Sequence, residues 1–334
     1  MLEHEIIGQM RTAIDLELRE CVTTHFGALP MEFKSMVEYQ MGWENGTSTS
    51  PGKRLRPLIL LSACHALGVD WQLALPAAAA IELVHNFSLV HDDIQDHSET
   101  RRGKPTIWVR WGEAQAINLG DTIFTLANLT LLNLPFAAEK ALDCTRSMQN
   151  AIFSLTQGQY LDLANESIEN ISIEDYWNMV AGKTGALFST CLEIAARLAG
   201  NTIEKPQKYA DLGLQLGRVF QVQDDYLGIW GNDLLTGKST ESDISSRKKT
   251  FPIIFALENL PEFREVWFTR KQFSPSDVAH LKRILDHNDI HQVTKMEANQ
   301  LYQEFMKNYE VLFGNTENKS ILQSILQDLL GREI

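Results

Sequence analysis

The sequence has few of the residues that interrupt secondary structure. Its 334 residues include only 20 glycines and 10 prolines, which is sparse for a sandwich or barrel of many short strands. No segment shows a sustained alternation of apolar and polar residues. Hydrophobic residues make up 44% of the chain and charged residues 22%, which supports a sizeable core and excludes a disordered or collagen-like chain. Long helices are therefore expected.

Cysteine is scarce, and its positions are far apart. Cys21, Cys64, Cys144 and Cys191 include no CxxC pair, which argues against a zinc site or a disulfide framework. We expect buried free thiols in a reducing compartment.

Basic residues are also fewer than acidic ones. Forty-three acidic residues against 30 basic ones give a net charge of -13, so the chain lacks the footprint of a nucleic-acid-binding protein. The first residues, MLEHEIIGQM, carry early acids and do not resemble a signal peptide. No stretch approaches the roughly 18 uninterrupted apolar residues of a membrane span. These absences predict a cytoplasmic protein without a membrane span.

Apolar residues recur at helical spacing over most of the chain. Residues 42–52 and 231–247 are polar and predict loops, the first of which ends an N-terminal helix. Pro252 begins a further helical stretch, and the pattern weakens around residues 263–275. The spacing predicts long helices over residues 56–67, 73–96, 113–132, 141–164, 173–199, 205–230 and 296–312. Without repeats or a long linker, we expect one all-α domain over residues 1–334.

Three carboxylates end the predicted helix over residues 73–96. Asp92 and Asp96 are four residues apart, so on a helix they share one face, with β-carbons about 5–6 Å apart. Asp93 lies about 100° around the helix from Asp92. Like charges at this spacing repel each other, so the cluster calls for a cation, and hard oxygen ligands suit Mg²⁺. A solvated acidic helix end is the alternative interpretation.

Two arginines follow this acidic cluster. Arg101 and Arg102 place permanent positive charges near the carboxylates. Carboxylates that hold Mg²⁺ beside arginines that bind phosphate oxygens make a polyphosphate site. An internal salt-bridge cluster is the alternative.

A second acidic pair occurs near the end of another long apolar helix. Asp224 and Asp225 lie close to the negative end of the predicted helix dipole, where a cation is favourable. If this helix faces the first one, opposed carboxylates line a cavity. The two motifs together therefore outline a site for three metal ions.

Basic residues supply the remaining charges of such a site. Lys53, Arg54 and Arg56 gather at a predicted loop-to-helix junction, where backbone N–H groups and the helix dipole favour an anion. Lys183 interrupts an apolar helix, and Lys238 follows the second acidic pair. Each lysine alone is typical of a protein surface, so the argument depends on the set.

The motifs together resemble the trans-isoprenyl diphosphate synthases, also called polyprenyl synthetases. The resemblance extends from Gly52 to about Pro252. It is carried by Gly-Lys-Arg-Leu-Arg-Pro at 52–57, Asp-Asp-Ile-Gln-Asp at 92–96, Arg-Arg-Gly at 101–103, and Asp-Asp-Tyr-Leu at 224–227 preceded by Phe220-Gln221. Two departures occur: Gly228 stands where many members have a third aspartate, and Asn232-Asp233 replaces an Asp-Pro. We expect the first to weaken outer metal contacts and to leave Asp224 as a metal ligand.

The resemblance implies an isoprenoid synthase fold, a single large antiparallel helix bundle around a deep central cavity, paired as a homodimer. It also implies a Mg²⁺-dependent prenyltransferase of isoprenoid biosynthesis, with Mn²⁺ as an alternative ion. The metal ligands for three ions would be Asp92, Asp96 and Asp224, with metal-bound waters oriented by Asp93 and Asp225. The allylic diphosphate would be bound by Arg101, Lys183 and Lys238. Isopentenyl diphosphate would be bound by Lys53, Arg56, His85 and Arg102. The residues near the reacting carbons would be Thr184 and Gln221, with Phe220 as a further substrate contact.

Product length depends on the space below the first aspartate motif. Phe87 and Ser88 stand five and four residues before Asp92, roughly one helical turn below it. A ring at Phe87 limits elongation by its volume, whereas Ser88 leaves open a place that short-chain members commonly fill with a second aromatic residue. This pattern resembles geranylgeranyl diphosphate synthases and predicts a twenty-carbon product, with fifteen or twenty-five carbons as neighbours. Ordinary core packing of Phe87 is the alternative.

Three rival functions share some of these features. A class I terpene cyclase has the first acidic motif but needs no isopentenyl diphosphate site, so the basic stretch at 52–57 argues against it. A non-catalytic synthase subunit tends to lose an acidic motif, and both are present. A structural helical bundle with surface charge is the third alternative.

Overall fold

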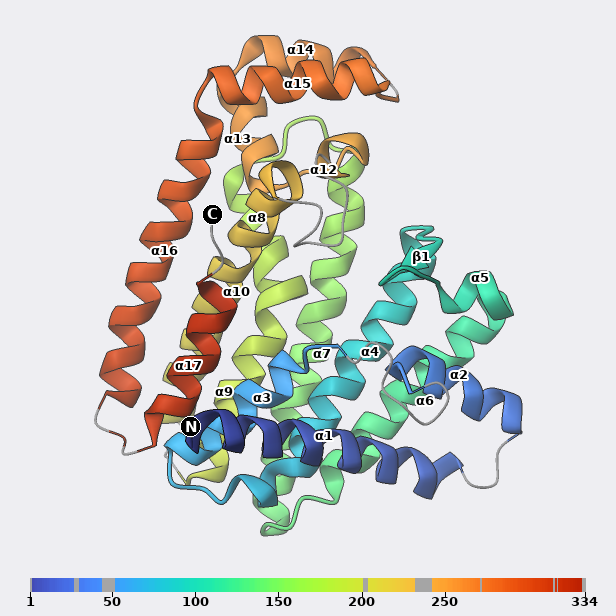
Figure 1. Cartoon of the computed structure of the whole chain (residues 1–334), viewed down its shortest axis with the longest axis vertical. Coiled ribbons are helices and arrows are strands. Elements are labelled where there is room, and N and C mark those ends of the chain that lie inside the picture. The colour runs from blue at the N-terminus through green and yellow to red at the C-terminus, as the bar shows by residue number, and fades with distance from the viewer. Residues whose placement is uncertain are drawn as a thin grey trace. The chain divides into compact units, whose positions relative to one another are not determined.

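The computed structural model describes residues 2–26, 30–43, 52–200, 204–231, 242–270, 272–314, 316 and 318–331. These residues are almost entirely helical (Figure 1), as predicted. The helices are α1 (Leu2–Phe26), α2 (Met31–Met41), α3 (Leu55–Ala66), η2 (Trp71–Ala74), α4 (Leu75–Gln95), α5 (Ile107–Trp111), α6 (Glu113–Leu132), α7 (Ala138–Ser167), α8 (Ile173–Val180), η3 (Ala181–Gly185), α9 (Ala186–Leu198), α10 (Glu204–Trp230), α12 (Ser242–Ser245), α13 (Phe251–Asn259), α14 (Pro261–Thr269), α15 (Pro275–His287), α16 (Ile290–Phe313) and α17 (Lys319–Leu330). The strands β1 (Thr100–Arg101) and β2 (Lys104–Pro105) form one short antiparallel pair.

The chain divides into two compact units. Unit 1 contains Met1–Ile152, Thr190–Ala210 and Phe313–Ile325. Unit 2 contains Phe153–Ser189, Asp211–Leu312 and Leu326–Ile334. The single domain expected over residues 1–334 stays a prediction.

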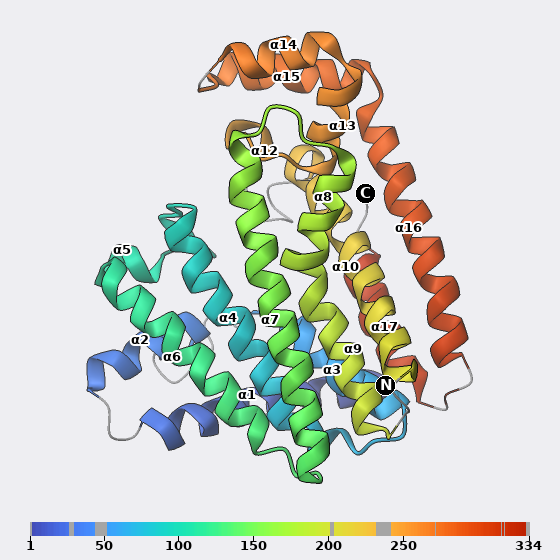
Figure 2. The same cartoon turned by 180° about the vertical axis from the view of Figure 1, so that it is seen from behind.

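Helix α4 of unit 1 carries many of the predicted site residues. Pro76 lies in its first turn, where the missing N–H group has no intrahelical partner to lose. The alanines at 77–80 are fully buried, and their small side chains allow neighbouring helices to approach closely. Helices α3 and α6 pack against α4 in both views (Figures 1 and 2). The apolar stretch Trp71–Gln95 is long enough to cross a membrane, but 67% of its most apolar window is buried inside the protein, as in a core helix.

Apolar clusters hold the described helices of unit 2 together. One contains Phe263 and Trp267 of α14 together with Leu281 of α15, and these two helices run side by side (Figures 1 and 2). The other joins α8, α10, α13 and α16 around Tyr176 and Val222. These clusters include residues of α10, which carries Gln221, Asp224 and Asp225, and of α8, which directly precedes Lys183 and Thr184 in η3.

Serine caps determine where two helices of unit 2 begin. The Ser172 hydroxyl accepts the Asp175 N–H bond, and the Asp175 carboxylate accepts the Ser172 N–H bond, which forms a capping box at α8. Ser274 and Asp277 make the same exchange at α15. Each box satisfies backbone donors that the first helical turn leaves unpaired.

The predicted helices agree closely with the observed ones, and the main differences have physical reasons. The helix predicted over residues 113–132 coincides with α6. The stretch 173–199 contains a π-helical turn, η3, between α8 and α9. The weak region at 263–275 includes most of α14, because nine residues hold too few repeats to show a period. The pair β1 and β2 was not predicted, since two residues per strand show no alternation.

The loops predicted over residues 42–52 and 231–247 lie mostly outside the described residues, and within the second one residues 242–245 form the short helix α12 and not a loop. The expectation of buried free cysteines is confirmed. Helix α2 ends at Gly42, which adopts a left-handed conformation with φ 76° and so favours glycine. All four cysteines are free and buried. Burial raises the pKa of the Cys64, Cys144 and Cys191 thiols, so they are protonated near neutral pH. The cytoplasmic location stays a prediction.

Candidate active site

The first aspartate motif lies at the carboxyl end of α4 in unit 1. The helix ends at Gln95, and Asp96 is its C-cap, whose backbone N–H donates to the Asp92 carbonyl at 2.8 Å. This bond keeps Asp92 and Asp96 one helical turn apart, as predicted. Asp96 is exposed and Asp92 is half-buried. Both carboxylates lie at the negative end of the helix dipole, which favours a bound cation.

Asp93 has different surroundings from its two neighbours. It is 2% exposed, and its Oδ1 accepts bonds from Arg101 Nε at 2.8 Å and Arg101 Nη2 at 2.7 Å. Burial raises the pKa of Asp93, and the bonds from Arg101 oppose that rise. Arg101 Nη2 also lies 3.7 Å from Asp92 Oδ2. The internal salt bridge therefore exists at Asp93, while Asp92 and Asp96 keep more of their surface for ligands.

A tight turn between β1 and β2 carries Arg102. Arg102 and Gly103 have φ values of 53° and 74°, the left-handed pair that a two-residue hairpin turn requires. The Arg102 guanidinium lies against Gly52: a β-carbon at Gly52 would be 3.0 Å from Arg102 Nη2. A glycine at 52 therefore gives Arg102 its place beside the turn that precedes α3.

His85 of α4 lies among arginines. Arg56 Nη1 lies 3.5 Å from His85 Nε2. Burial and the charges of Arg56, Arg102, Arg101 and Arg54 lower the pKa of His85 well below its usual value, so its ring is neutral at physiological pH. A neutral imidazole among guanidinium groups suits a multiply charged anion, because the arginines supply charge and the ring supplies a directed hydrogen bond.

Of the three basic residues at this junction, Arg54 is paired inside the protein. Arg54 is buried, and its Nη1 lies 2.6 Å from Glu82 Oε1. This partner neutralises it inside the protein, which corrects the expectation that all three basic residues of the junction favour an anion. Lys53 is exposed and Arg56 is half-buried, so Arg54 is the most enclosed of the three.

Unit 1 has cavities of different sizes among its described residues. A small one of about 50 Å³ is lined in part by Asp93, Arg101 and Arg102. A larger one of about 880 Å³ is lined by α2 and α6 residues such as Phe33 and Leu126 and by none of the predicted site residues. Of these two cavities, the smaller one lies at the predicted charged residues.

The second aspartate motif lies on α10 in unit 2. Asp225 is 2% exposed, and its carboxylate accepts bonds from Tyr176 Oη at 2.7 Å, Gln221 Nε2 at 2.7 Å and the Phe251 N–H at 2.9 Å. Burial, followed by the charge of Asp243, raises the pKa of Asp225 to about 6. Asp224 is half-buried. As in the first motif, one carboxylate is held inside the protein and its neighbour keeps surface for a ligand.

Lys183 and Thr184 lie in the π-helical turn η3. Lys183 Nζ donates to Asp162 Oδ2 at 2.5 Å, and Thr184 Oγ1 donates to Gln221 Oε1 at 2.6 Å. Gln221 thus bridges Thr184 and Asp225, which fixes the orientation of its amide. π-Helical turns occur frequently at functional sites, and this one presents the two predicted side chains of its helix.

The place beside Gly228 is taken by another carboxylate. A β-carbon at Gly228 would lie 2.1 Å from Asp243 Oδ2, so a side chain at 228 and the observed Asp243 position exclude each other. Asp243, at the start of α12, thereby supplies a carboxylate next to the position where many family members have their third aspartate. The expected weakening of the second motif at Gly228 stays a prediction.

Four residues of unit 2 join this site without having been predicted: Asp162, Tyr176, Asp243 and Lys248. Burial alone would lower the pKa of Lys248, but Asp162, Asp243, Asp225 and Asp224 outweigh that effect and raise it. These carboxylates act on Lys248 through their charge, and its side chain remains exposed. No local spacing links the four residues, since they come from α7, α8 and the segment around α12, so only the tertiary structure reveals the group.

The remaining predicted residues either contact neighbouring groups or lie outside the described part of the chain. Phe87 is buried against Phe124 of α6, with ring centroids 5.3 Å apart, and Ser88 Oγ donates to the His85 carbonyl at 2.8 Å. Phe220 packs on Phe188 at 5.5 Å. The predicted site residue Lys238 and the departure at Asn232-Asp233 lie outside the described residues. That the two acidic motifs face each other stays a prediction.

The acidic residues suit Mg²⁺ that is shared with a diphosphate. Among the described residues, no group of three or more His, Cys, Asp or Glu side chains could hold a metal ion. Mg²⁺ typically takes one or two carboxylates and completes its shell with water and substrate phosphates. The accessible carboxylates Asp92, Asp96 and Asp224 are donors of this kind, so the residues fit a metal that arrives with its phosphate ligand.

Sequence comparison places the chain in a known family. The profile of the polyprenyl synthetase family matches residues 44–287, and the chain belongs to this family. The (2E,6E)-farnesyl diphosphate synthase of Mycobacterium tuberculosis is 39% identical over 233 residues, which are 69% of this chain and 64% of that protein. The geranylgeranyl diphosphate synthase of the same organism is 38% identical over 232 residues, 68% and 66% of the two chains. The chain thus matches just under two thirds of the length of these relatives.

Solved structures show the same isoprenoid synthase fold over nearly the whole chain. The polyprenyl synthetase of Streptomyces coelicolor A3(2) is 30% identical with a TM-score of 0.88, covering 97% of this chain and 98% of that one. A polyprenyl synthase of Caulobacter crescentus CB15, complexed with calcium and isoprenyl diphosphate, is 25% identical with a TM-score of 0.83, covering 98% and 97%.

Proposed function

We propose that this chain is a prenyltransferase that condenses isopentenyl diphosphate with an allylic diphosphate and releases pyrophosphate. The observation that carries the proposal is the cation set around His85, which exists in addition to the acidic motif at the end of α4. A reaction between two diphosphates needs two anion sites, and His85 with Arg56 supplies the second. The names of the relatives support the same reaction class.

The isopentenyl diphosphate is assigned to the basic residues of unit 1. They are Lys53, Arg56, His85 and Arg102. Arg56 and Arg102 neutralise the diphosphate and bind its oxygens in pairs, while the neutral ring of His85 adds a hydrogen bond of fixed direction. Lys53 is exposed and meets the anion at the entrance.

The allylic diphosphate is assigned to Arg101, Lys183 and Lys238, with three Mg²⁺ ions, or Mn²⁺ in their place, held by Asp92, Asp96 and Asp224. The metal supplies charge stabilisation for the departing pyrophosphate when it is bound. The calcium complex of the Caulobacter relative supports a divalent ion with an isoprenyl diphosphate. Asp93 and Asp225, beyond their expected role toward metal-bound water, hold Arg101 and Gln221 in position.

The chemical step needs no nucleophilic side chain. The allylic C–O bond breaks and leaves a carbocation, the double bond of isopentenyl diphosphate forms the new C–C bond, and a proton passes to the pyrophosphate. Thr184 and Gln221 present oriented dipoles near the reacting carbons, because their mutual bond at 2.6 Å fixes both groups. Preorganised dipoles of this kind stabilise developing charge without reorganisation. Phe220 adds a substrate contact.

The proposed product is a short-chain all-trans prenyl diphosphate, with twenty carbons as the specific proposal. Phe87 and Phe124 together close the space beside α4, whereas Ser88 contributes little volume. The named relatives make fifteen- and twenty-carbon products, which supports this range.

The proposed assembly is a homodimer formed through one face of α7. Leu142, Phe153 and Tyr160 are 54%, 64% and 71% exposed. Their spacings of 11 and 7 residues return to within about 20° of the same direction at 100° per residue. Large apolar side chains in one exposed row are typical of a protein–protein interface, and a second copy of the chain presents the same row.

One turnover assay tests the proposal against its rivals. The chain is incubated with Mg²⁺, radiolabelled isopentenyl diphosphate and, in turn, a ten-, fifteen- or twenty-carbon allylic diphosphate. A synthase incorporates the label into a longer diphosphate. A terpene cyclase consumes the allylic substrate without the label, which would replace the proposal. No turnover, with no Mg²⁺-dependent thermal shift from pyrophosphate, would leave a non-catalytic subunit or a structural bundle.

A further inference from the structure

Arg54 lies between Lys53 and Arg56, the two residues of its turn assigned to isopentenyl diphosphate. It is the N-cap of α3, and its backbone adopts a left-handed conformation with φ 49° and ψ 37°. This conformation is unfavourable for a residue with a β-carbon. Such strain persists where surrounding contacts hold it, and it clusters at functional sites. The side chain, 3% exposed, provides those contacts.

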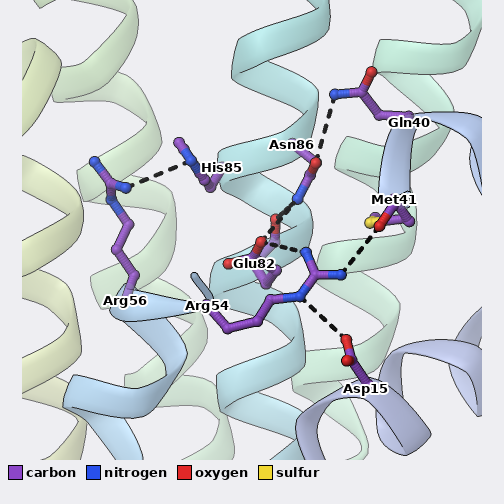
Figure 3. Close-up of polar contacts among 8 residues, drawn as sticks. All are labelled: Asp15, Gln40, Met41, Arg54, Arg56, Glu82, His85 and Asn86. Atoms are coloured by element: carbon purple, nitrogen blue, oxygen red, sulfur yellow. Dashed lines mark hydrogen bonds and ion pairs between the residues drawn. The ribbon is translucent and has the colours of Figure 1, made fainter. Parts of the chain in front are cut away.

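The guanidinium of Arg54 is bound by three other segments of unit 1 (Figure 3). Nη1 donates to Glu82 Oε1 on α4 at 2.6 Å, and Nε donates to Asp15 Oδ1 on α1 at 3.1 Å. Nη2 donates to the Met41 carbonyl at the end of α2, at 3.2 Å. One side chain therefore ties the turn to α1, α2 and α4 at once.

Glu82 is itself held in a buried network. It is 3% exposed, and Asn86 Nδ2 donates to its carbonyl at 2.8 Å and to Oε1 at 3.2 Å. Gln40 Nε2 approaches Asn86 Oδ1 at 3.5 Å. A buried ion pair is a poor source of stability, because apolar residues of similar volume often stabilise a fold equally well or better. The network instead fixes the position of the turn, since each bond restricts where the turn can lie.

The network places Arg54 and Arg56 on different sides of the turn. In Figure 3 the Arg54 side chain points to Glu82, whereas the Arg56 guanidinium points to His85. Glu82 and His85 are three residues apart on α4, so they are neighbours on its surface. The ion pair between Arg54 and Glu82 therefore places Arg56 beside His85. Arg102 contacts the start of the same turn at Gly52.

We infer that Arg54 is a positioning residue for the isopentenyl diphosphate site. Its bonds to Glu82, Asp15 and the Met41 carbonyl hold the turn in the strained conformation that presents Lys53 and Arg56 to the diphosphate. The inference rests on the proposed function, and Arg54 itself touches no substrate. Loss of this anchor weakens binding of isopentenyl diphosphate and leaves the allylic site largely intact.

A double variant tests this without leaving a buried charge unpaired. Arg54→Met with Glu82→Met removes both charges of the pair and keeps the side chains apolar. We expect the dissociation constant of isopentenyl diphosphate, titrated calorimetrically without an allylic substrate, to rise about tenfold, equivalent to about 1.4 kcal/mol. The KM for isopentenyl diphosphate rises in parallel, and the KM for the allylic substrate changes less than twofold. Arg54→Lys, which retains the charge but not the forked geometry, gives a smaller rise.

The matched control is an arginine–glutamate pair elsewhere in unit 1. Arg197 Nη2 lies 2.7 Å from Glu193 Oε1 on α9, and its double methionine variant leaves both KM values unchanged. Thermal unfolding confirms that each variant is folded. Unchanged isopentenyl diphosphate binding in the folded Arg54 variant overturns the inference, as do equal losses for both substrates. Failure of the wild-type chain to turn over refutes the proposed function, and failure to bind isopentenyl diphosphate overturns both.

Discussion

Neighbouring aspartates in both motifs have opposite surroundings. Asp93 and Asp225 are each 2% exposed and hydrogen-bonded inside the protein. Asp92 and Asp224, directly before them, are half-buried. Two identical side chains therefore have different surroundings: one is buried and holds a basic or amide partner, and the other keeps more exposed surface. The alternation follows from the 100° step of the helix, which turns adjacent residues to different environments.

Asp92 should be indispensable for turnover but not for folding. Asp92→Ala removes a metal ligand that stabilises charge in the transition state, so kcat should fall by about a hundredfold to a thousandfold or more. Radiolabel incorporation measures the loss, and circular dichroism checks the fold. Glu113→Ala, at an exposed position in the first turn of α6, is the control and should retain activity. Near-normal turnover of the Asp92 variant would refute the assignment of Asp92 as a metal ligand.

Phe87 and Ser88 should set product length in opposite directions. Phe87→Ala opens the space that its ring and Phe124 fill, so longer products should appear. Ser88→Phe adds a ring one turn below Asp92, so products should shorten. Chromatography of the dephosphorylated products measures both effects. An unchanged product distribution in both variants means that Phe87 is ordinary core packing.

At the scale of elements, glycines bring three helices of unit 2 together at the candidate site. A β-carbon at Gly158 of α7 would lie 2.1 Å from the Lys183 backbone nitrogen in η3. One at Gly217 of α10 would lie 2.6 Å from the Gly185 α-carbon. These close approaches allow Lys183 to reach Asp162 on α7 and Thr184 to reach Gln221 on α10. Backbone contact of this kind leaves no room for a larger residue.

Two glycine-to-alanine changes should have opposite effects on stability. Gly158→Ala forces α7 away from η3, because the obstructing atoms are backbone, and should destabilise the protein by about 1–3 kcal/mol, as overpacking typically does. Gly8→Ala in α1 meets nothing within 4 Å and should stabilise by about 0.5–1 kcal/mol through helix propensity. Urea unfolding measures both. A Gly158 variant as stable as the wild type would show that η3 moves freely.

For the whole molecule, His85 should make stability depend on pH. Burial and nearby arginines lower its pKa in the folded state, whereas the unfolded chain titrates near 6.5. Below about pH 6.5 the unfolded state binds more protons, so the free energy of unfolding should fall by up to about 1.4 kcal/mol per pH unit, and the contribution is fully present above that pH. His85→Gln removes this component. Urea unfolding from pH 5 to 8 should show the wild-type advantage over this variant shrinking toward acid, and a constant difference would contradict the assignment.

The proposed dimer gives a second prediction at this scale. Phe153→Glu places a charge in the exposed apolar row of α7, where burial against a second copy would leave the charge unpaired. Sedimentation should show a shift from dimer to monomer. Glu174→Gln, an exposed position in the first turn of α8, is the control and should sediment as the wild type does. A monomeric wild-type chain refutes the assembly.

The sequence by itself determined the all-α class, most helix boundaries and the spacing of both aspartate motifs. These properties depend on local regularities: the 3.6-residue period, the residues at helix ends, and the four-residue interval from Asp92 to Asp96. A regularity that repeats within one element is visible in the order of residues. The departure at Gly228 was visible for the same reason, because it falls at a fixed interval within a motif.

Only the tertiary structure decided which charged side chains are paired inside the protein. Arg54 looks equivalent to Lys53 and Arg56 in the sequence, yet its partners Glu82 and Asp15 are 28 and 39 residues away. Asp225 meets Tyr176 across 49 residues, and Asp243 reaches the place beside Gly228 from another segment. No local period encodes such pairs. They form because packing brings distant polar groups into a dry interior, where each must find a partner.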